Sequence, residues 1–240
     1  MDNGVTVLDN ILDESMLSYC KNKIIELDSE FKKYETHFWF HNKLGSHTEF
    51  RGKKINDNYL EEAKIYNSIL WDNFKNVYQT IADKLSEHFK INCVYNQNIF
   101  LPGIRTFVPK VLGVMNDNAD FFHYDYNIYI VDWKKILDKN ITDTISVTVA
   151  IEVPDYSYFD YINGTQTNDP NIYSINPTRE QSEKMMDRCV SILCKEGSAT
   201  CQWNHTIHRM GKLKFSNLNQ RRTSIQISGV YDGEKLWLTW

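Results

Sequence analysis

The chain has 240 residues, of which 42% are hydrophobic and 24% charged, and these ordinary values exclude a wholly disordered protein. Its net charge of −4 argues against a nucleic-acid-binding protein, which usually carries a basic balance. No apolar run reaches the roughly 18 residues of a membrane span, and the first residues do not have the pattern of a signal peptide. With five cysteines and no CxxC pair, we expect free thiols and a cytoplasmic protein, with no prediction of its oligomeric state.

The first part of the chain, residues 1–92, is predicted to be mainly helical. Alternation favours a short strand over residues 5–8, and Asp13 is placed to cap a helix whose apolar side chains recur every three or four residues. A second apolar stripe predicts a long helix from residue 57 or 58 to about Phe89, which would lie across a sheet. Residues 34–56, between the two helices, are predicted to be irregular.

Residues 93–240 are predicted to form the β part of the same single domain. The clearest strand pattern is rich in β-branched residues, covers residues 145–153 and ends at Pro154. Shorter strands are predicted at residues 93–95, 99–101, 106–108 and 110–115.

The last third of the chain continues this pattern after an interruption. An aromatic connection over residues 155–177 is predicted to lead into a short helix over residues 178–188, which opens with a capping box. Two hairpins follow: one joins residues 189–194 to 198–203, and one joins residues 222–230 to 235–240. Many short strands after a helical beginning predict a mainly β fold of the sandwich or jelly-roll type.

The segment His123-Tyr-Asp125 is the first candidate for chemistry. Residues i and i+2 of an extended segment point to the same side, so an imidazole and a carboxylate are presented together. His208, 85 residues after His123, is the candidate for a third ligand. Two histidines and one carboxylate are the ligand set of non-haem Fe(II) oxygenases, in which the remaining metal positions stay open.

A second pattern indicates a carboxylate-binding site. His208 follows the turn residue Gly197 by eleven residues, and Arg222 follows His208 by fourteen. Arg222 opens an alternating strand in which it shares one face with Ser224, while β-branched residues occupy the other face. A guanidinium with a hydroxyl two residues further on can bind both oxygens of a carboxylate.

With these motifs, residues 100–230 resemble the Fe(II)/2-oxoglutarate-dependent oxygenases. The resemblance implies a double-stranded β-helix, the cupin-like jelly roll, with the N-terminal helices packed on one sheet. It implies that His123, Asp125 and His208 bind Fe(II), and that Arg222, helped by Ser224, pairs with the distal carboxylate of 2-oxoglutarate. O2 is the other cosubstrate implied. The reaction implied is hydroxylation of a C–H bond in a small molecule or an amino-acid side chain.

Alternatives remain for individual site residues. His205 competes with His208, although the spacing from the turn favours His208. Because the interval from His208 to Arg222 is long for this family, Arg221 or Lys214 could replace Arg222.

Two further groups of residues lie outside these motifs. The histidines of the irregular region are interpreted as plain polar residues; they are His37, His41 and His47. The aromatic residues that open the 155–177 connection fit a substrate pocket or lid as well as they fit a packed loop; they are Tyr156, Tyr158, Phe159 and Tyr161.

Two other functions fit the same type of barrel. One is a cupin-like metal enzyme that does not use 2-oxoglutarate, and the other is a non-catalytic binding module. The polar face of the strand that begins at Arg222 argues against the first, and the intact set of ligand residues argues against the second.

Overall fold

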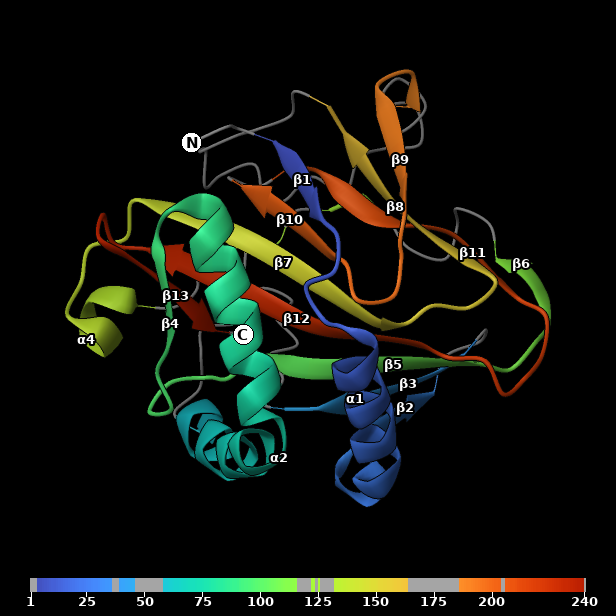
Figure 1. Ribbon diagram of the computed structural model, residues 1–240, viewed down its shortest axis with the longest axis horizontal. Helices are drawn as coiled ribbons and strands as arrows, with labels where there is room; N and C mark the ends of the chain where they lie inside the picture. Colours follow the sequence, from blue (N-terminus) through green and yellow to red (C-terminus); the bar gives the residue numbers. More distant parts are fainter. Residues whose placement is uncertain are drawn as a thin grey trace.

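The computed structural model describes residues 4–35, 39–45, 58–115, 122–123, 125, 132–163, 186–203 and 206–239. These residues form two β-sheets, and the larger sheet carries two long helices (Figure 1). The mainly β jelly-roll fold expected from the sequence is confirmed. No helix within the described residues is both long enough and apolar enough to cross a membrane.

The larger sheet is built almost entirely from antiparallel pairs. Its main path runs through β1 (Val5–Leu8), β10 (Ala199–Trp203), β7 (Asp143–Glu152), β12 (Arg222–Tyr231), β5 (Gly103–Pro109), β3 (Trp39–Leu44) and β2 (Lys32–Glu35). Off this path, β13 (Lys235–Thr239) pairs with β12 and, in parallel, with β4 (Asn92–Tyr95). Strands distant in sequence therefore lie side by side, as β12 does with both β5 and β7.

The smaller sheet has four antiparallel strands, in the order β6 (Gly113–Met115), β11 (His208–Phe215), β8 (Tyr156–Ile162) and β9 (Cys189–Leu193). Along the edge of β11 that pairs with β6, an isolated bridge joins His123 to His208. The chain segment that contains His123 is therefore held beside the first residue of β11.

The two long helices form where the sequence pattern predicts them. Helix α1 (Glu14–Glu26) begins after Asp13, whose side chain accepts a hydrogen bond from the backbone N–H of Met16 at 2.8 Å. Helix α2 (Asn58–Phe89) covers the long apolar stripe. Two shorter helices are η1 (Asp28–Glu30) and α4 (Trp133–Leu137).

The main core lies between these helices and the larger sheet. On β12, Ile225 and Ile227 are buried in one cluster with Phe74 and Ile81 of α2, so the β-branched face of this strand meets the helices. Side chains alternate along a strand, so Arg222 and Ser224 face the opposite side, toward the smaller sheet. The polar face of β12 is therefore turned to the interior between the two sheets.

Several predicted elements need correction. Residues 34–56 are not irregular throughout, because strand β3 and the end of β2 lie there. Residues 156–162 form strand β8, where a connection was predicted. Residues 99–101 are not a strand. The helix predicted over residues 178–188 lies almost wholly outside the described residues.

The predicted hairpin around Gly197 is also wrong. Strand β9 pairs with β8 in the smaller sheet, whereas β10 pairs with β1 and β7 in the larger sheet. The turn at Gly197 therefore carries the chain from one sheet to the other. Gly197 has a φ of +76°, and a Cβ there would lie 2.4 Å from the backbone oxygen of Leu12, so this crossing needs glycine.

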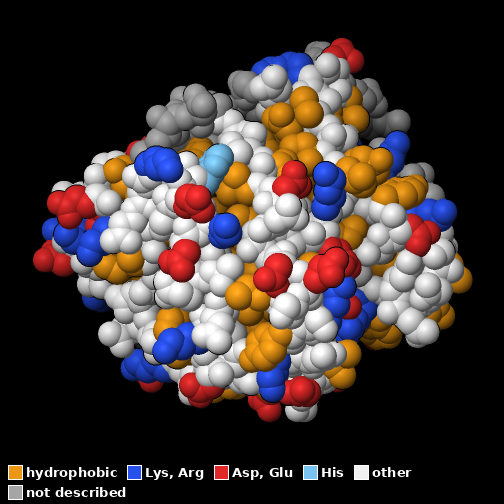
Figure 2. Space-filling model, viewed as in Figure 1, with side chains coloured by type: hydrophobic (Ala, Val, Ile, Leu, Met, Phe, Trp, Pro, Cys, Tyr) orange, Lys and Arg blue, Asp and Glu red, His pale blue; other side chains and the backbone are white. Residues whose placement is uncertain are grey.

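The surface carries charges of both signs. On the face of the molecule drawn in Figure 2, Lys and Arg side chains are interspersed with Asp and Glu. This distribution agrees with the small net charge of −4.

Candidate functional site

Three side chains converge where His123 lies against β11. Potential ligand atoms of His123, Asp125 and His208 all lie within 4.8 Å of one another, and no other group of three or more His, Cys, Asp or Glu in the described part of the chain does so. Asp125 Oδ2 is 3.5 Å from His208 Nε2, and Asp125 Oδ1 is 3.9 Å from His123 Nε2. The structure thus brings together the three residues singled out in the sequence.

Backbone hydrogen bonds set the spacing of the two histidines. The N–H of His123 donates to the carbonyl of His208 at 2.8 Å, and the N–H of His208 donates to the carbonyl of His123 at 3.0 Å. Their rings are 4.6 Å apart between centroids. Paired residues of neighbouring strands project to the same side, which is why both imidazoles lie on one side of the backbone bridge.

The imidazole of His208 is held in one orientation. Its Nδ1 lies 2.9 Å from the backbone oxygen of Thr206, which can only accept, so Nδ1 donates this hydrogen bond and Nε2 faces Asp125. The ring of Phe159 stacks on the His208 ring at 5.4 Å. His208 is buried, so water cannot easily compete for its Nε2.

The carboxyl group of Asp125 is held in its ionised form. Burial acts to raise its pKa, but the nearby His208 and His123 act in the opposite direction. A hydrogen bond with Ser146 of β7 and the charge of Arg105 on β5 also lower it. The pKa of Asp125 therefore lies below its ordinary value, and the group remains a negatively charged carboxylate at neutral pH.

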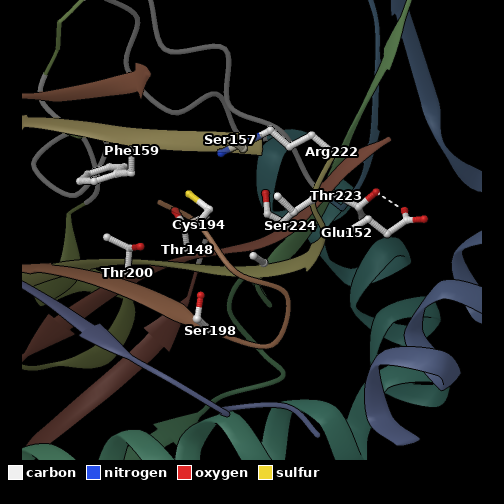
Figure 3. A pocket seen from close by; sticks show the side chains of 12 residues that line it. Thr148, Glu152, Ser157, Phe159, Cys194, Ser198, Thr200, Arg222, Thr223 and Ser224 are labelled. Carbon is white, nitrogen blue, oxygen red and sulfur yellow. Dashed lines mark hydrogen bonds between the residues drawn. The ribbon is translucent and has the colours of Figure 1, made fainter. Parts of the chain in front are cut away.

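A pocket lies between the two sheets beside this cluster (Figure 3). Its lining comes from β7, β8, β10, β12 and the segments that flank them: Thr148, Ala150, Glu152, Val153, Ser157, Phe159, Cys194, Ser198, Thr200, Arg222, Thr223 and Ser224. Phe159 belongs to this lining and also contacts His208, so the pocket adjoins the His–Asp–His cluster.

Arg222 and Ser224 both line this pocket, as their shared strand face predicts. The Nε–H of Arg222 donates to Ser157 Oγ across the interior at 3.2 Å, and its guanidinium lies over the ring of Phe107. Ser224 is 2% exposed, and its buried Oγ has no hydrogen-bond partner among the described residues. A buried hydroxyl without a partner is costly in a protein interior, so this position is suited to a polar ligand.

The alternatives to Arg222 are engaged elsewhere. Arg221 forms a salt bridge with Glu152 at 2.9 Å. Lys214 lies 3.7 Å from a carboxylate oxygen of Asp155 and is 42% exposed. His205, the alternative to His208, lies outside the described residues.

The remaining histidines and aromatic residues are only partly described. His37 and His47 lie outside the described residues. His41, on β3, stacks on Phe107 at 4.3 Å; burial, with the charges of nearby Lys43, Arg105 and Arg222, lowers its pKa to about 3. It is therefore uncharged at neutral pH. The aromatic residues of the predicted connection belong to strand β8, and among them Phe159 lines the pocket.

Sequence reasoning missed the contribution of β5. Arg105 pairs with Ser224 and Phe107 pairs with Arg222, so β5 places a cation and a ring beside the two residues predicted to bind a carboxylate. The alternation of Arg105 and Phe107 with Ile104 and Thr106 was the available signal. It does not reveal that β5 and β12 are neighbours.

Known proteins resemble this chain in fold and not in sequence. No protein-family model matches the sequence, and no curated protein matches it. AviO1 from Streptomyces viridochromogenes Tue57 has a TM-score of 0.52 at 10% identity, covering 97% of this chain and 91% of AviO1.

Two other neighbours have lower scores. HygX from Streptomyces hygroscopicus, solved with nickel, 2-oxoglutarate and hygromycin B, has a TM-score of 0.47 at 11% identity, over 94% of this chain and 82% of HygX. SnoK, a non-heme alpha ketoglutarate dependent carbocyclase from nogalamycin biosynthesis, has a TM-score of 0.48 at 13% identity, over 95% of this chain and 80% of SnoK. What these comparisons show is a fold shared with AviO1.

Proposed function

We propose that this protein is an Fe(II)- and 2-oxoglutarate-dependent oxygenase that hydroxylates a C–H bond of a small molecule or an amino-acid side chain. One observation carries the proposal: two imidazoles and one carboxylate converge within 4.8 Å inside a jelly roll. The adjoining pocket adds an arginine and a hydroxyl without a partner among the described residues.

His123, Asp125 and His208 would hold the metal. Their donor atoms are two imidazole nitrogens and an ionised carboxylate, which suit Fe(II) and leave part of its coordination sphere open. The Thr206 carbonyl accepts the Nδ1 hydrogen bond of His208 and so holds the ring with Nε2 facing Asp125. These features are those of a ligand set prepared before the metal binds.

Arg222 and Ser224 would hold the distal carboxylate of 2-oxoglutarate. The guanidinium supplies charge-assisted hydrogen bonds, and the carboxylate would give the buried Ser224 hydroxyl the acceptor that it lacks among the described residues. Arg105 lies opposite Ser224 on β5 and adds positive charge to this side of the interior. An anion that carries a carboxylate at the end remote from the metal therefore fits this position.

Bound Fe(II), with 2-oxoglutarate and O2, would supply the oxidation, in which 2-oxoglutarate is converted to succinate and CO2 while one oxygen atom enters the substrate. The chain's own residues orient the reactants and limit the access of water. Phe159, which is 7% exposed, covers His208 on the pocket side. Exclusion of water matters because a reactive species formed beside solvent is lost to side reactions.

The test is anaerobic addition of Fe(II) and then 2-oxoglutarate, followed by visible absorption spectroscopy. We expect the metal-to-ligand charge-transfer band of chelated 2-oxoglutarate, and its loss in His123→Ala and His208→Ala. His88→Ala, which removes an exposed histidine of α2, is the matched control and should keep the band. Metal binding without the band would support a metal enzyme that does not use 2-oxoglutarate, and absence of metal binding would support a binding module.

A further inference from the structure

The outer face of the smaller sheet contains a buried ion pair behind the His–Asp–His cluster. Arg209 on β11 and Asp160 on β8 are register partners, and they are 7% and 4% exposed. Both Nη2 and Nε of Arg209 contact Asp160 Oδ2, at 3.0 and 3.1 Å. An arginine that is paired in this way at this depth has a restricted orientation, because moving it would leave a charge buried without its partner.

The surroundings of Asp160 are adapted to this pair. Ser191 on β9 donates a hydrogen bond from its hydroxyl to Asp160 Oδ1 at 2.6 Å. Gly211 on β11 leaves room for the carboxylate, since a Cβ at this position would come within 2.5 Å of Oδ1. Three strands therefore contribute to holding one carboxylate, and that carboxylate holds Arg209.

The guanidinium of Arg209 reaches beyond β11. Its central carbon lies 4.3 Å from the ring centroid of Phe122, which is 3% exposed. This distance allows a cation–π contact, which is strongest where water is excluded. Arg209 thus joins β11 to the segment that contains His123.

The two partners of this contact are the chain neighbours of two candidate ligands. Phe122 precedes His123, and Arg209 follows His208. The backbone bridge between His123 and His208 lies between the two contacts, with the imidazoles on one side and the Phe122–Arg209 contact on the other. A shift of Phe122 would therefore be transmitted directly to the imidazole of His123.

We propose that Arg209, oriented by Asp160, is a positioning residue for the metal centre. Its guanidinium fixes Phe122 against the back of β11 and so sets the distance between the two imidazoles on the interior side. The proposal rests on the function proposed above, since it takes His123 and His208 to be metal ligands. The effect expected is on metal affinity, beyond any effect on folding.

The test is titration of the full chain with Co(II) alone, without 2-oxoglutarate, by absorption spectroscopy and calorimetry. Phe122→Leu keeps the Arg209–Asp160 pair and an apolar side chain but removes the ring; we expect about 10-fold weaker Co(II) binding, the scale of losses at residues that orient metal ligands. Arg209→Met should weaken Co(II) binding at least as much, and Arg209→Lys should recover part of the affinity because an ammonium keeps the charge.

The control is Ile162→Val, which trims a neighbour of Phe122 in the same apolar cluster and leaves the guanidinium untouched. It should lower the melting temperature without changing the affinity for Co(II). If Arg209→Met does not fold, Phe122→Leu decides the question.

Two results would overturn the proposal in distinguishable ways. An affinity of Phe122→Leu within about twofold of the unchanged protein, with binding lost in His208→Ala, would show that the metal site exists without this positioning role. Absence of Co(II) binding by the unchanged protein would overturn the proposed metal site itself, and the positioning role with it.

Discussion

Both faces of the larger sheet have buried side chains, but the buried side chains of the two faces have opposite chemistry. On β12, Ile225 is 0% exposed on the face that packs against the helices, and Ser224 is 2% exposed on the face that looks toward the smaller sheet. The same alternation holds on β7, where Val147 and Val149 belong to the helix-side core while Thr148 lines the pocket.

This difference shows that burial has two separate uses here. The helix side is close-packed and apolar, so its side chains contribute mainly to the free energy of folding. The interior side keeps polar atoms buried, and Ser224 Oγ has no hydrogen-bond partner among the described residues. Such an arrangement costs stability and is expected where a ligand completes the hydrogen bonding. Substitutions on the two sides should therefore separate activity from stability.

The largest effect on activity is expected at the His–Asp–His cluster. His208→Ala removes one of three candidate ligands, and turnover, measured as succinate release, should fall below about 1% of the unchanged protein because open-site metal chemistry requires the metal. His205→Ala should keep most of the activity. The reverse pattern, with loss in His205→Ala and retention in His208→Ala, would exchange the roles of these two histidines.

The largest effect on stability is expected on the helix side. Ile225→Ala should lower the free energy of unfolding by about 3 kcal/mol, because it creates a cavity in a close-packed core. Denaturant unfolding measures this loss. The 2-oxoglutarate concentration needed for half-maximal activity should stay the same in the fraction that is folded, and a large rise would show that the two faces are not separable.

A more selective effect is expected at Arg222. Arg222→Ala should raise the 2-oxoglutarate requirement by roughly 30-fold or more, since loss of a buried charged partner costs about 2–5 kcal/mol. The affinity for the metal alone should be nearly unchanged. Arg221→Ala is the neighbouring control, because Arg221 pairs with Glu152. A large change in Arg221→Ala with none in Arg222→Ala would move the carboxylate site to Arg221.

The smallest effect, and the sharpest comparison with Ile225, is expected at Ser224. Ser224→Ala should leave the melting temperature unchanged or slightly higher, because it removes a buried hydroxyl that has no partner among the described residues. The 2-oxoglutarate requirement should rise about fivefold, the equivalent of about 1 kcal/mol for one hydrogen bond. A clear fall in the melting temperature with normal 2-oxoglutarate binding would make Ser224 a structural residue.

Local patterns in the sequence were sufficient for elements with long or pure signals. The apolar stripe of α2 and the β-branched run of β7 predict their elements to within a few residues. Strand β8 was missed because its tyrosines and aspartate resemble a polar connection, and its burial depends on what packs on each side. Strand β2 forms the edge of the larger sheet and β3 lies next to it, where few apolar residues are required, so their signal is weak.

The sequence by itself determined the kinds of donor atoms and the division of each strand into two faces, because side chains alternate with a period of two whatever the fold. Only the tertiary structure decided which face became the interior. On β12 it is the face of Arg222, since α1 and α2 cover the other one.

Tertiary structure also decided which distant residues meet. The bridge between His123 and His208, and the pairing of β5 with β12 that brings Arg105 to Ser224, depend on strand neighbours that no local pattern encodes. Hydrogen bonds between strands form through backbone groups that are the same in nearly every residue, so the choice of partner is made by the packing of the whole molecule.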